Sequence, residues 1–192
     1  MELFSENLNN DNEVRSGDFL LAEPMLLDPN FQRTVVIVCE HKDDEGSFGL
    51  IVNRQADVNI EQLEDFLYLQ GNLYVGGPVQ QNTLHFLHQI PELEGSILLR
   101  DGVYWGGDYE QLKELHIQGK VNAHNCRFFI GYSGWGKLQL KGELLQNSWV
   151  ISRVDLSLLF KVEPDELWQR VLEQMGGKYK MFTNYPVDPS LN

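Results

Sequence analysis

Residues 34–53 read TVVIVCEHKDDEGSFGLIVN and contain two strand-like runs separated by a charged turn. The runs TVVIVCE and SFGLIVN are rich in β-branched and aromatic residues, which favour strands, and the polar HKDDEG between them ends in glycine. This pattern predicts an antiparallel hairpin.

Further elements are expected on both sides of the hairpin. Short apolar runs predict strands at 18–22, 72–77, 83–88, 96–99, 103–107, 126–132 and 148–153. Helical spacing predicts helices at 59–67, 108–119, 138–146 and 163–177. Asn59 with Gln62, and Asp108 with Gln111, have the spacing of a capping box. Because hairpins outnumber parallel crossovers, the expected fold class is α+β with a mixed, mostly antiparallel sheet and flanking helices.

One domain is expected over residues 17–180. Residues 1–16 are rich in Asn, Asp and Glu without apolar periodicity, which is typical of a flexible acidic tail. Residues 181–192 include two prolines and no pattern, and they are expected to form a second tail.

The composition is that of a soluble globular protein, with 42% hydrophobic and 22% charged residues. Cys39 and Cys126 lie inside apolar runs, which indicates buried thiols in a reducing cytosol. The N-terminus lacks the basic and apolar segments of a secretory signal, and no apolar run approaches the ~18 residues of a membrane span. A cytoplasmic protein without a membrane partner is expected.

The net charge of −13 opposes direct nucleic-acid binding, which depends on Lys and Arg neutralising phosphates. The charge is unevenly distributed. Residues 120–153 hold five basic residues and one acid, or +4, which leaves −17 for the remainder.

The segment 131–143, GYSGWGKLQLKGE, comes close to two catalytic motifs. A phosphate-binding loop would use Gly131 and Lys137, but Leu138 stands where a hydroxyl should bind Mg²⁺. A serine-hydrolase elbow would use Ser133, but Trp135 replaces the second small residue and all five histidines precede the serine. Neither activity is predicted.

A weaker hypothesis for this segment is an anion site. A strand that ends in glycines before a helix presents free N–H groups, and Lys137 is the candidate anion contact. The alternative is that the glycines permit a tight turn while Trp135 packs on the sheet.

Other candidate side chains come from strand ends. Cys39 and His41 are two residues apart and are expected on one face of a strand, with Glu40 opposite; a Cys-His pair could form an activated thiolate, although a buried Cys is the more common case. His85 and His88 are three apart on a predicted strand and should point to opposite faces. No metal site and no cofactor are predicted.

Asn53 and Arg54 end a predicted strand, and Gly76 and Gly77 begin a glycine turn. Polar residues at strand ends beside glycine turns are frequent in functional sites.

Several of these segments together resemble the YqgE/AlgH family of bacterial proteins, over about residues 17–177. They are GDFLLAEPMLLDPNFQRTVVIVCEH, GSFGLIVNR, YVGGPV, GYSGWGKLQLKGEL and LWQRVLEQMGG. The resemblance implies a bifurcated sheet folded into a pseudo-barrel, and a label of transcriptional regulator without an agreed biochemical activity.

The family pattern G-Y-A-G-W-G-P-G-Q-L-E-x-E-L differs from this chain at Ser133, Lys137 and Leu138, where Ala, Pro and Gly are usual. A site shared with the family is expected among residues that match. These candidate ligand or interaction residues are Glu40, His41, Asn53, Arg54, Gly76, Gly77, Gly131, Gly134, Trp135, Gly136, Gln139 and Glu143.

Three function classes follow. The first is a cytosolic binding or interaction module that acts in regulation through an unknown protein or small-molecule partner, and the sequence favours it. The second is an anion- or nucleotide-binding protein or enzyme with a pocket near Glu40, His41, Asn53 and Arg54. The third is a direct DNA-binding regulator, which the charge and the lack of a helix-turn-helix oppose.

Overall fold

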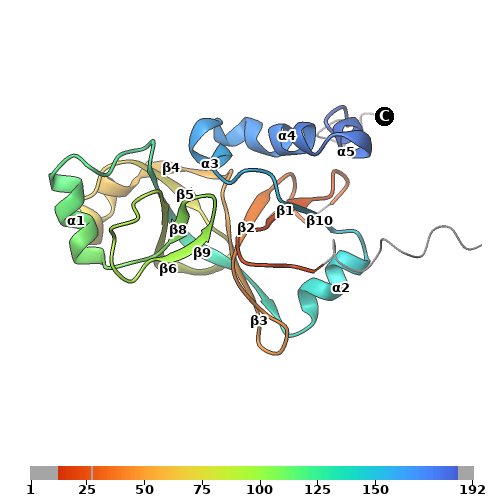
Figure 1. The fold of residues 1–192 in the computed structure, drawn as a ribbon, viewed down its shortest axis with the longest axis horizontal. Coiled ribbons are helices and arrows are strands. Elements are labelled where there is room, and N and C mark those ends of the chain that lie inside the picture. The colour runs from red at the N-terminus through yellow and green to blue at the C-terminus, as the bar shows by residue number, and fades with distance from the viewer. Residues whose placement is uncertain (1–12, 27, 186–192) are drawn as a thin grey trace, which may run out of the picture.

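The computed structural model describes residues 13–26 and 28–185 (Figure 1). Most of the two expected tails, 1–12 and 186–192, lies outside this range. Val14 is buried in a hydrophobic cluster with β1, and the last helix continues to Phe182. Packed structure therefore extends past residue 17 at one end and residue 180 at the other.

The described residues form strands, helices and two short 3₁₀ turns. The strands are β1 (Phe19–Ala22), β2 (Val35–Lys42), β3 (Gly46–Ile51), β4 (Gln55–Asn59), β5 (Asn72–Val75), β6 (Val79–His88), β7 (Ile97–Arg100), β8 (Val103–Trp105), β9 (Cys126–Gly136) and β10 (Trp149–Ser152). The helices are α1 (Tyr109–Ile117), α2 (Gln139–Leu145), α3 (Leu158–Lys161), α4 (Pro164–Met175) and α5 (Gly177–Phe182), and the turns are η1 (Ile60–Gln62) and η2 (Glu64–Phe66).

Strand β9 is where the sheet divides. The main path runs β10-β1-β2-β3-β9-β6-β8-β7. The first part of β9 pairs with β5 in parallel at Phe128–Ile130, and its last part pairs with β3 antiparallel from Ser133 to Gly136. β6 pairs antiparallel with β9 from Cys126 to Tyr132. The observed fold is therefore α+β with a branched, mostly antiparallel sheet.

The sheet is not closed by strand pairing. No ladder joins β7 to β10 or β1 among the described residues. Instead, the side chain of Arg100 at the end of β7 donates to the carbonyl oxygens of Arg153 and Val154 at 2.8 Å and of Gly17 at 3.3 Å. The expected pseudo-barrel is thus not observed as a closed sheet, and side-chain contacts bring its two ends together.

The helices cover separate parts of the sheet (Figure 1). Helices α3, α4 and α5 lie along one side, and Trp168 of α4 is buried and donates to the carbonyl of Ala22 in β1 at 3.0 Å. Helix α1 lies at the far end over a second cluster that includes Phe128 of β9. Helix α2 covers a third cluster around Trp135 and Trp149.

The hairpin, α1, α2 and α4 are confirmed, and the side chain of Asp108 caps α1 by accepting from the N–H of Gln111. The single helix predicted at 59–67 is wrong, because Leu63 is extended and separates η1 from η2. The capping contact is nevertheless present, since Gln62 accepts from the N–H of Asn59 at 2.8 Å. Packing decides the shape of this short segment, since Ile60 is buried in the second cluster with Leu69 and Leu73, while Leu67 is exposed.

Candidate functional site

A surface groove of about 400 Å³ lies where the β2–β3 hairpin meets the end of β9. This end of the hairpin projects from the body of the molecule at the lower edge of Figure 1. We call it the β3–β9 groove, and its lining residues are Glu40, Lys42, Glu45, Gly46, Ser47, Phe48, Val79, Tyr132, Gly134, Trp135 and Gly136.

The groove arises from the alternation of side chains along the strands. Gly46 pairs with Gly136, and Phe48 pairs with Gly134. In each strand a glycine is therefore two residues from an aromatic side chain on the same face, since Tyr132 precedes Gly134 by two. Positions without side chains next to large rings leave a hollow beside those rings.

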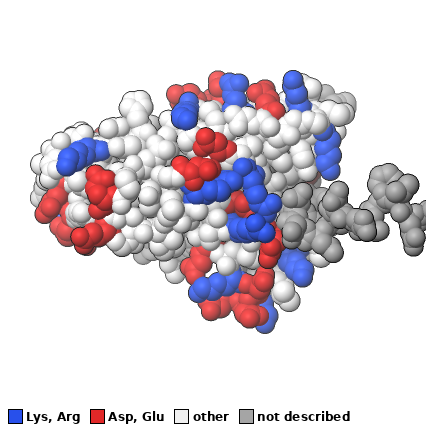
Figure 2. Space-filling model, viewed as in Figure 1, with Lys and Arg blue, Asp and Glu red and all other residues white. Residues whose placement is uncertain are grey.

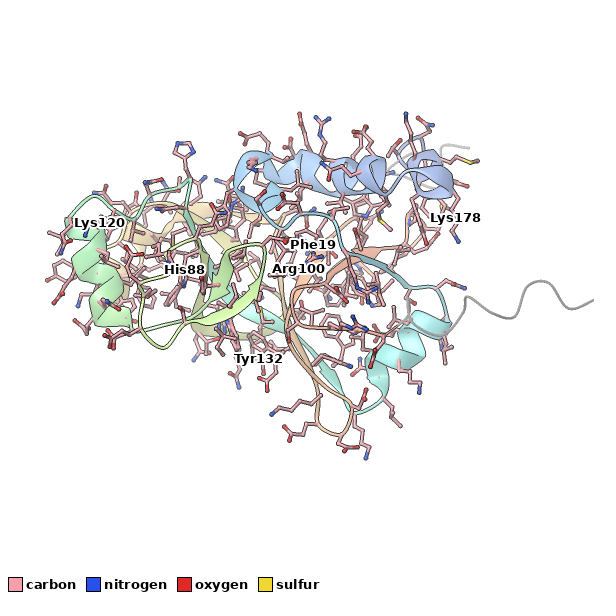
Figure 3. The ribbon with its side chains drawn as sticks, in the orientation of Figure 1. Phe19, His88, Arg100, Lys120, Tyr132 and Lys178 are labelled. Carbon is pink, nitrogen blue, oxygen red and sulfur yellow. The ribbon has the colours of Figure 1, made fainter. Side chains whose placement is uncertain are left out.

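The wall of the groove continues into an aromatic cluster drawn from four strands. The ring of Phe48 lies 4.6 Å from Tyr132, 5.0 Å from Trp105 and 5.1 Å from His85, centroid to centroid. All four rings are half-buried, and Figure 3 labels Tyr132 at the lower margin of the sheet. Burial lowers the pKa of His85, which therefore favours its neutral form.

The rim of the groove is acidic. Lys42 Nζ donates to Glu40 at 2.9 Å and to Glu45 at 2.8 Å, so one ammonium serves two carboxylates. Asp43 and Asp44 follow in the turn, and Lys137 lies 3.7 Å from Asp44. Four acids and two lysines give this hairpin end a net charge of −2, with histidine left out of the count. Figure 2 shows these opposite charges gathered at the projecting end.

The predicted pocket of four residues does not form. Glu40 and His41 lie near the turn of the hairpin, while Asn53 and Arg54 lie beyond its open end, where Val36 pairs with Ile51. Asn53 accepts from the N–H of Val35 and donates to the carbonyl of Arg33, and Arg54 donates to the carbonyls of Asn30 and Pro29. Both residues hold the segment that leads into β2, and the hypothesis of a shared pocket is wrong.

Three of the predicted glycines permit close backbone contact. A Cβ on Gly76 would lie 2.3 Å from the carbonyl oxygen of Gly131, and one on Gly77 would lie 2.2 Å from the carbonyl of Tyr132. Gly131 has a φ of +66°. Ser133 is fully buried and donates to the carbonyl of Gly76 at 3.1 Å, so its hydroxyl serves this contact.

Trp135, Gln139 and Glu143 form a network that joins β9 to α2. One carboxylate oxygen of Glu143 accepts from the indole N–H of Trp135 at 2.9 Å and of Trp149 at 2.7 Å. The other accepts from Gln139 at 3.0 Å, and Gln139 accepts from the N–H of Gly136. The Trp135 ring contacts the rings of Phe31 and Trp149 within the third cluster. These residues anchor α2 beneath the groove.

The glycine segment that suggested an anion site is part of a strand. β9 continues to Gly136 and pairs with β3 over Gly134 and Trp135, so this stretch of backbone belongs to the sheet and forms no open loop. Lys137 is exposed and is directed toward Asp44, while Gln139 binds the N–H of Gly136. The geometry supports the alternative of packed glycines instead of a cradle for an anion.

A β-bulge changes the expected faces of β2. The register shifts between Val38 and Glu40, so Cys39 is an extra residue in the strand. Cys39 packs with Ile37, whereas His41 pairs with Ser47 and its Nδ1 lies 2.7 Å from the serine Oγ. The prediction that Cys39 and His41 share a face is wrong. Burial raises the pKa of the Cys39 thiol, which disfavours a thiolate.

His85 and His88 lie on different sides of β6, as predicted. His88 is fully buried, its Nε2 is 2.8 Å from the carbonyl of Gly106, and its Nδ1 accepts from the N–H of Ile90. Burial lowers the pKa of His88. Within residues 13–26 and 28–185, no group of three or more His, Cys, Asp or Glu could hold a metal ion. None of the helices in this part of the chain is long and apolar enough to cross a membrane.

Of the predicted site residues, Glu40, Gly134, Trp135 and Gly136 line the groove. The other lining residues were not predicted from sequence; they are Lys42, Glu45, Gly46, Ser47, Phe48, Val79 and Tyr132. A signal was present for the two rings: in Gly-x-Phe and Tyr-x-Gly-x-Gly, period-two spacing puts glycines and an aromatic residue on the same face.

The chain resembles known proteins along nearly its whole length. The sequence profile described as AlgH-like matches residues 19–180. A UPF0301 protein from Cytophaga hutchinsonii is 45% identical over 182 residues, covering 93% of this chain and 100% of the relative. A UPF0301 protein from Bacteroides thetaiotaomicron is 36% identical over 178 residues, covering 92% and 90%.

Two solved structures have a similar fold. The solution structure of the AlgH protein from Pseudomonas aeruginosa has a TM-score of 0.69 and 26% identity, covering 94% of this chain and 97% of that one. A crystal structure from Corynebacterium diphtheriae has a TM-score of 0.73 at 20% identity, covering 95% and 100%, which shows the shared fold alone.

Proposed function

The chain belongs to the AlgH-like family, and from this premise we propose that it is a binding module that docks a basic, extended segment of a partner protein in the β3–β9 groove. The observation that carries the proposal is the combination of a hollow, a half-buried aromatic wall and an acidic rim at one projecting end. Aromatic faces attract guanidinium and ammonium groups, and carboxylates pair with them.

The charge of the site favours a basic protein segment over other partners. The hairpin end that carries the groove has a net charge of −2, which repels phosphates, and the whole chain carries −13. We therefore propose that any regulatory role passes through a protein contact and not through direct DNA binding. Small cationic ligands could use the same aromatic and carboxylate contacts. The open groove and its position on a projecting hairpin nevertheless suit a linear segment.

The test is fluorescence-polarisation binding of a labelled peptide of alternating serine and arginine, compared with alternating serine and glutamate. We expect saturable binding of the arginine peptide alone. Gly136→Ile should weaken binding by roughly tenfold, because the new side chain fills the groove at an exposed position with no neighbour within 3.4 Å of the added Cβ. The control is Gln81→Ile, at an exposed position of β6 outside the groove. Equal binding of both peptides, or no effect of Gly136→Ile, would overturn the proposal.

A further inference from the structure

We propose that Lys42 occupies the binding position of the partner's cation in the free protein. Its ammonium lies between Glu40 and Glu45, and an arginine of the bound segment displaces it. This inference rests on the proposed function and assigns a specificity-determining role to one side chain of the same groove.

The geometry places Lys42 in the groove together with both of its partners. All three residues line the groove, and the contacts of 2.9 and 2.8 Å make the ammonium a bridge between the carboxylates. The bulge at Cys39 produces this arrangement, because the register after it pairs Glu40 with Phe48 and Lys42 with Gly46. Without the extra residue, alternation would direct Glu40 and Lys42 to the face that carries Ser47.

The pair of contacts is easily exchanged. The side chains of Lys42, Glu40 and Glu45 are 52%, 47% and 71% exposed, so water and salt weaken both contacts. One ammonium also leaves a charge of −1 on the two carboxylates. An incoming guanidinium can bind a carboxylate through two parallel N–H groups and can stack on an aromatic ring, neither of which an ammonium can do. A ligand cation that displaces Lys42 must therefore be superior to lysine, and the groove should prefer arginine.

This exchange predicts the sign of each substitution. Lys42→Met keeps the length of the side chain but removes the competitor, and it should tighten binding of the serine-arginine peptide by about three- to tenfold. The same change should reduce the preference for the serine-arginine peptide over a serine-lysine peptide. A lysine of the peptide then no longer has to displace the side chain of Lys42. Glu40→Gln and Glu45→Gln should each weaken binding of the arginine peptide.

A matched control distinguishes the displacement of Lys42 from the general electrostatic effect of removing one positive charge. Lys137→Met also removes one positive charge from the hairpin end, but Lys137 lies outside the groove lining and is paired with Asp44 at 3.7 Å. It should change affinity by less than about twofold at 0.15 M salt, because its exposed ammonium pairs with Asp44 and with neither carboxylate that Lys42 bridges.

Fluorescence-polarisation titrations of both peptides against wild type, Lys42→Met and Lys137→Met test this proposal. Circular dichroism verifies that each variant is folded. Tighter peptide binding in Lys42→Met alone, together with a reduced preference for arginine, supports the displacement of Lys42. If Lys42→Met binds the arginine peptide as wild type does, or if Lys137→Met tightens binding equally, the displacement proposal is overturned. The groove proposal is unaffected by that outcome, provided that Gly136→Ile still weakens binding. Failure of wild type to bind the arginine peptide overturns the proposed function itself.

Discussion

Leu138 shows how a single residue departs from the conformation that its side chain prefers. It precedes α2 with φ of 62° and ψ of −5°, in the left-handed region, and the residue is 60% exposed. A side chain with a Cβ pays about 1 to 2 kcal/mol in this region, whereas glycine does not. The family pattern that this chain resembles has glycine at this position, which the backbone conformation explains.

We therefore expect Leu138→Gly to raise the free energy of unfolding by about 0.5 to 1 kcal/mol, after the greater entropy of glycine in the unfolded chain is subtracted. Urea denaturation measures this change. Lys141→Gly is the control, because Lys141 is exposed within α2, where the backbone is helical, and the substitution should lower stability by roughly 1 kcal/mol. Equal destabilisation by both substitutions would contradict the assignment of strain to Leu138.

At the scale of elements, one carboxylate connects β9, α2 and β10. Glu143 accepts hydrogen bonds from the indoles of Trp135 and Trp149 and from the amide of Gln139. An amide has only one oxygen, so Glu143→Gln must leave at least one of these donors without an acceptor. We expect the free energy of unfolding to fall by about 1 to 3 kcal/mol.

The control for this prediction is Glu173→Gln on α4, where the carboxylate contacts the exposed side chains of Gln169 and Arg170. Its effect should stay within about 0.5 kcal/mol. Urea denaturation followed by tryptophan fluorescence provides both values. A Glu143→Gln protein as stable as Glu173→Gln would show that the network does not join the three elements energetically.

At the scale of the whole molecule, local patterns identified most elements but not their partners. The hairpin and the capped helices depend on residues near in sequence, so period and capping predicted them. The branch at β9 depends on pairs of residues far apart in sequence, such as Gly46 with Gly136 and Leu73 with Phe128. The alternation of β2 was misjudged because one extra residue at Cys39 inverts the faces that follow.

The candidate site was predicted only in part, because its residues also come together through strand pairing. Glu40, Gly134 and Gly136 were identified, but Phe48 and Lys42 join them only through pairing of β3 with β2 and β9. Asn53 and Arg54 were misassigned because polar residues at strand ends either bind ligands or hold neighbouring loops, and sequence does not distinguish these roles. Three-dimensional pairing supplies the distinction.

The open sheet is held together across its ends by Arg100, which Figure 3 labels beside Phe19 at the centre of the molecule. Its guanidinium donates to the carbonyls of Arg153, Val154 and Gly17, which belong to segments flanking β10 and β1. Arg100→Met preserves much of the apolar stem but removes these bonds and leaves partly buried carbonyls unpaired. We expect the free energy of unfolding to fall by about 1.5 to 3 kcal/mol.

Hydrogen exchange tests whether this loss concerns the whole fold. If Arg100 joins the ends of the sheet, amides of β7, β1 and β10 should all exchange faster in Arg100→Met, because opening at that junction frees both ends together. Arg15→Met is the control, since Arg15 is exposed and its guanidinium pairs with the neighbouring carboxylate of Glu13. Faster exchange confined to β7 would mean that Arg100 secures only its own strand and that the rest of the sheet keeps its shape without a bridge.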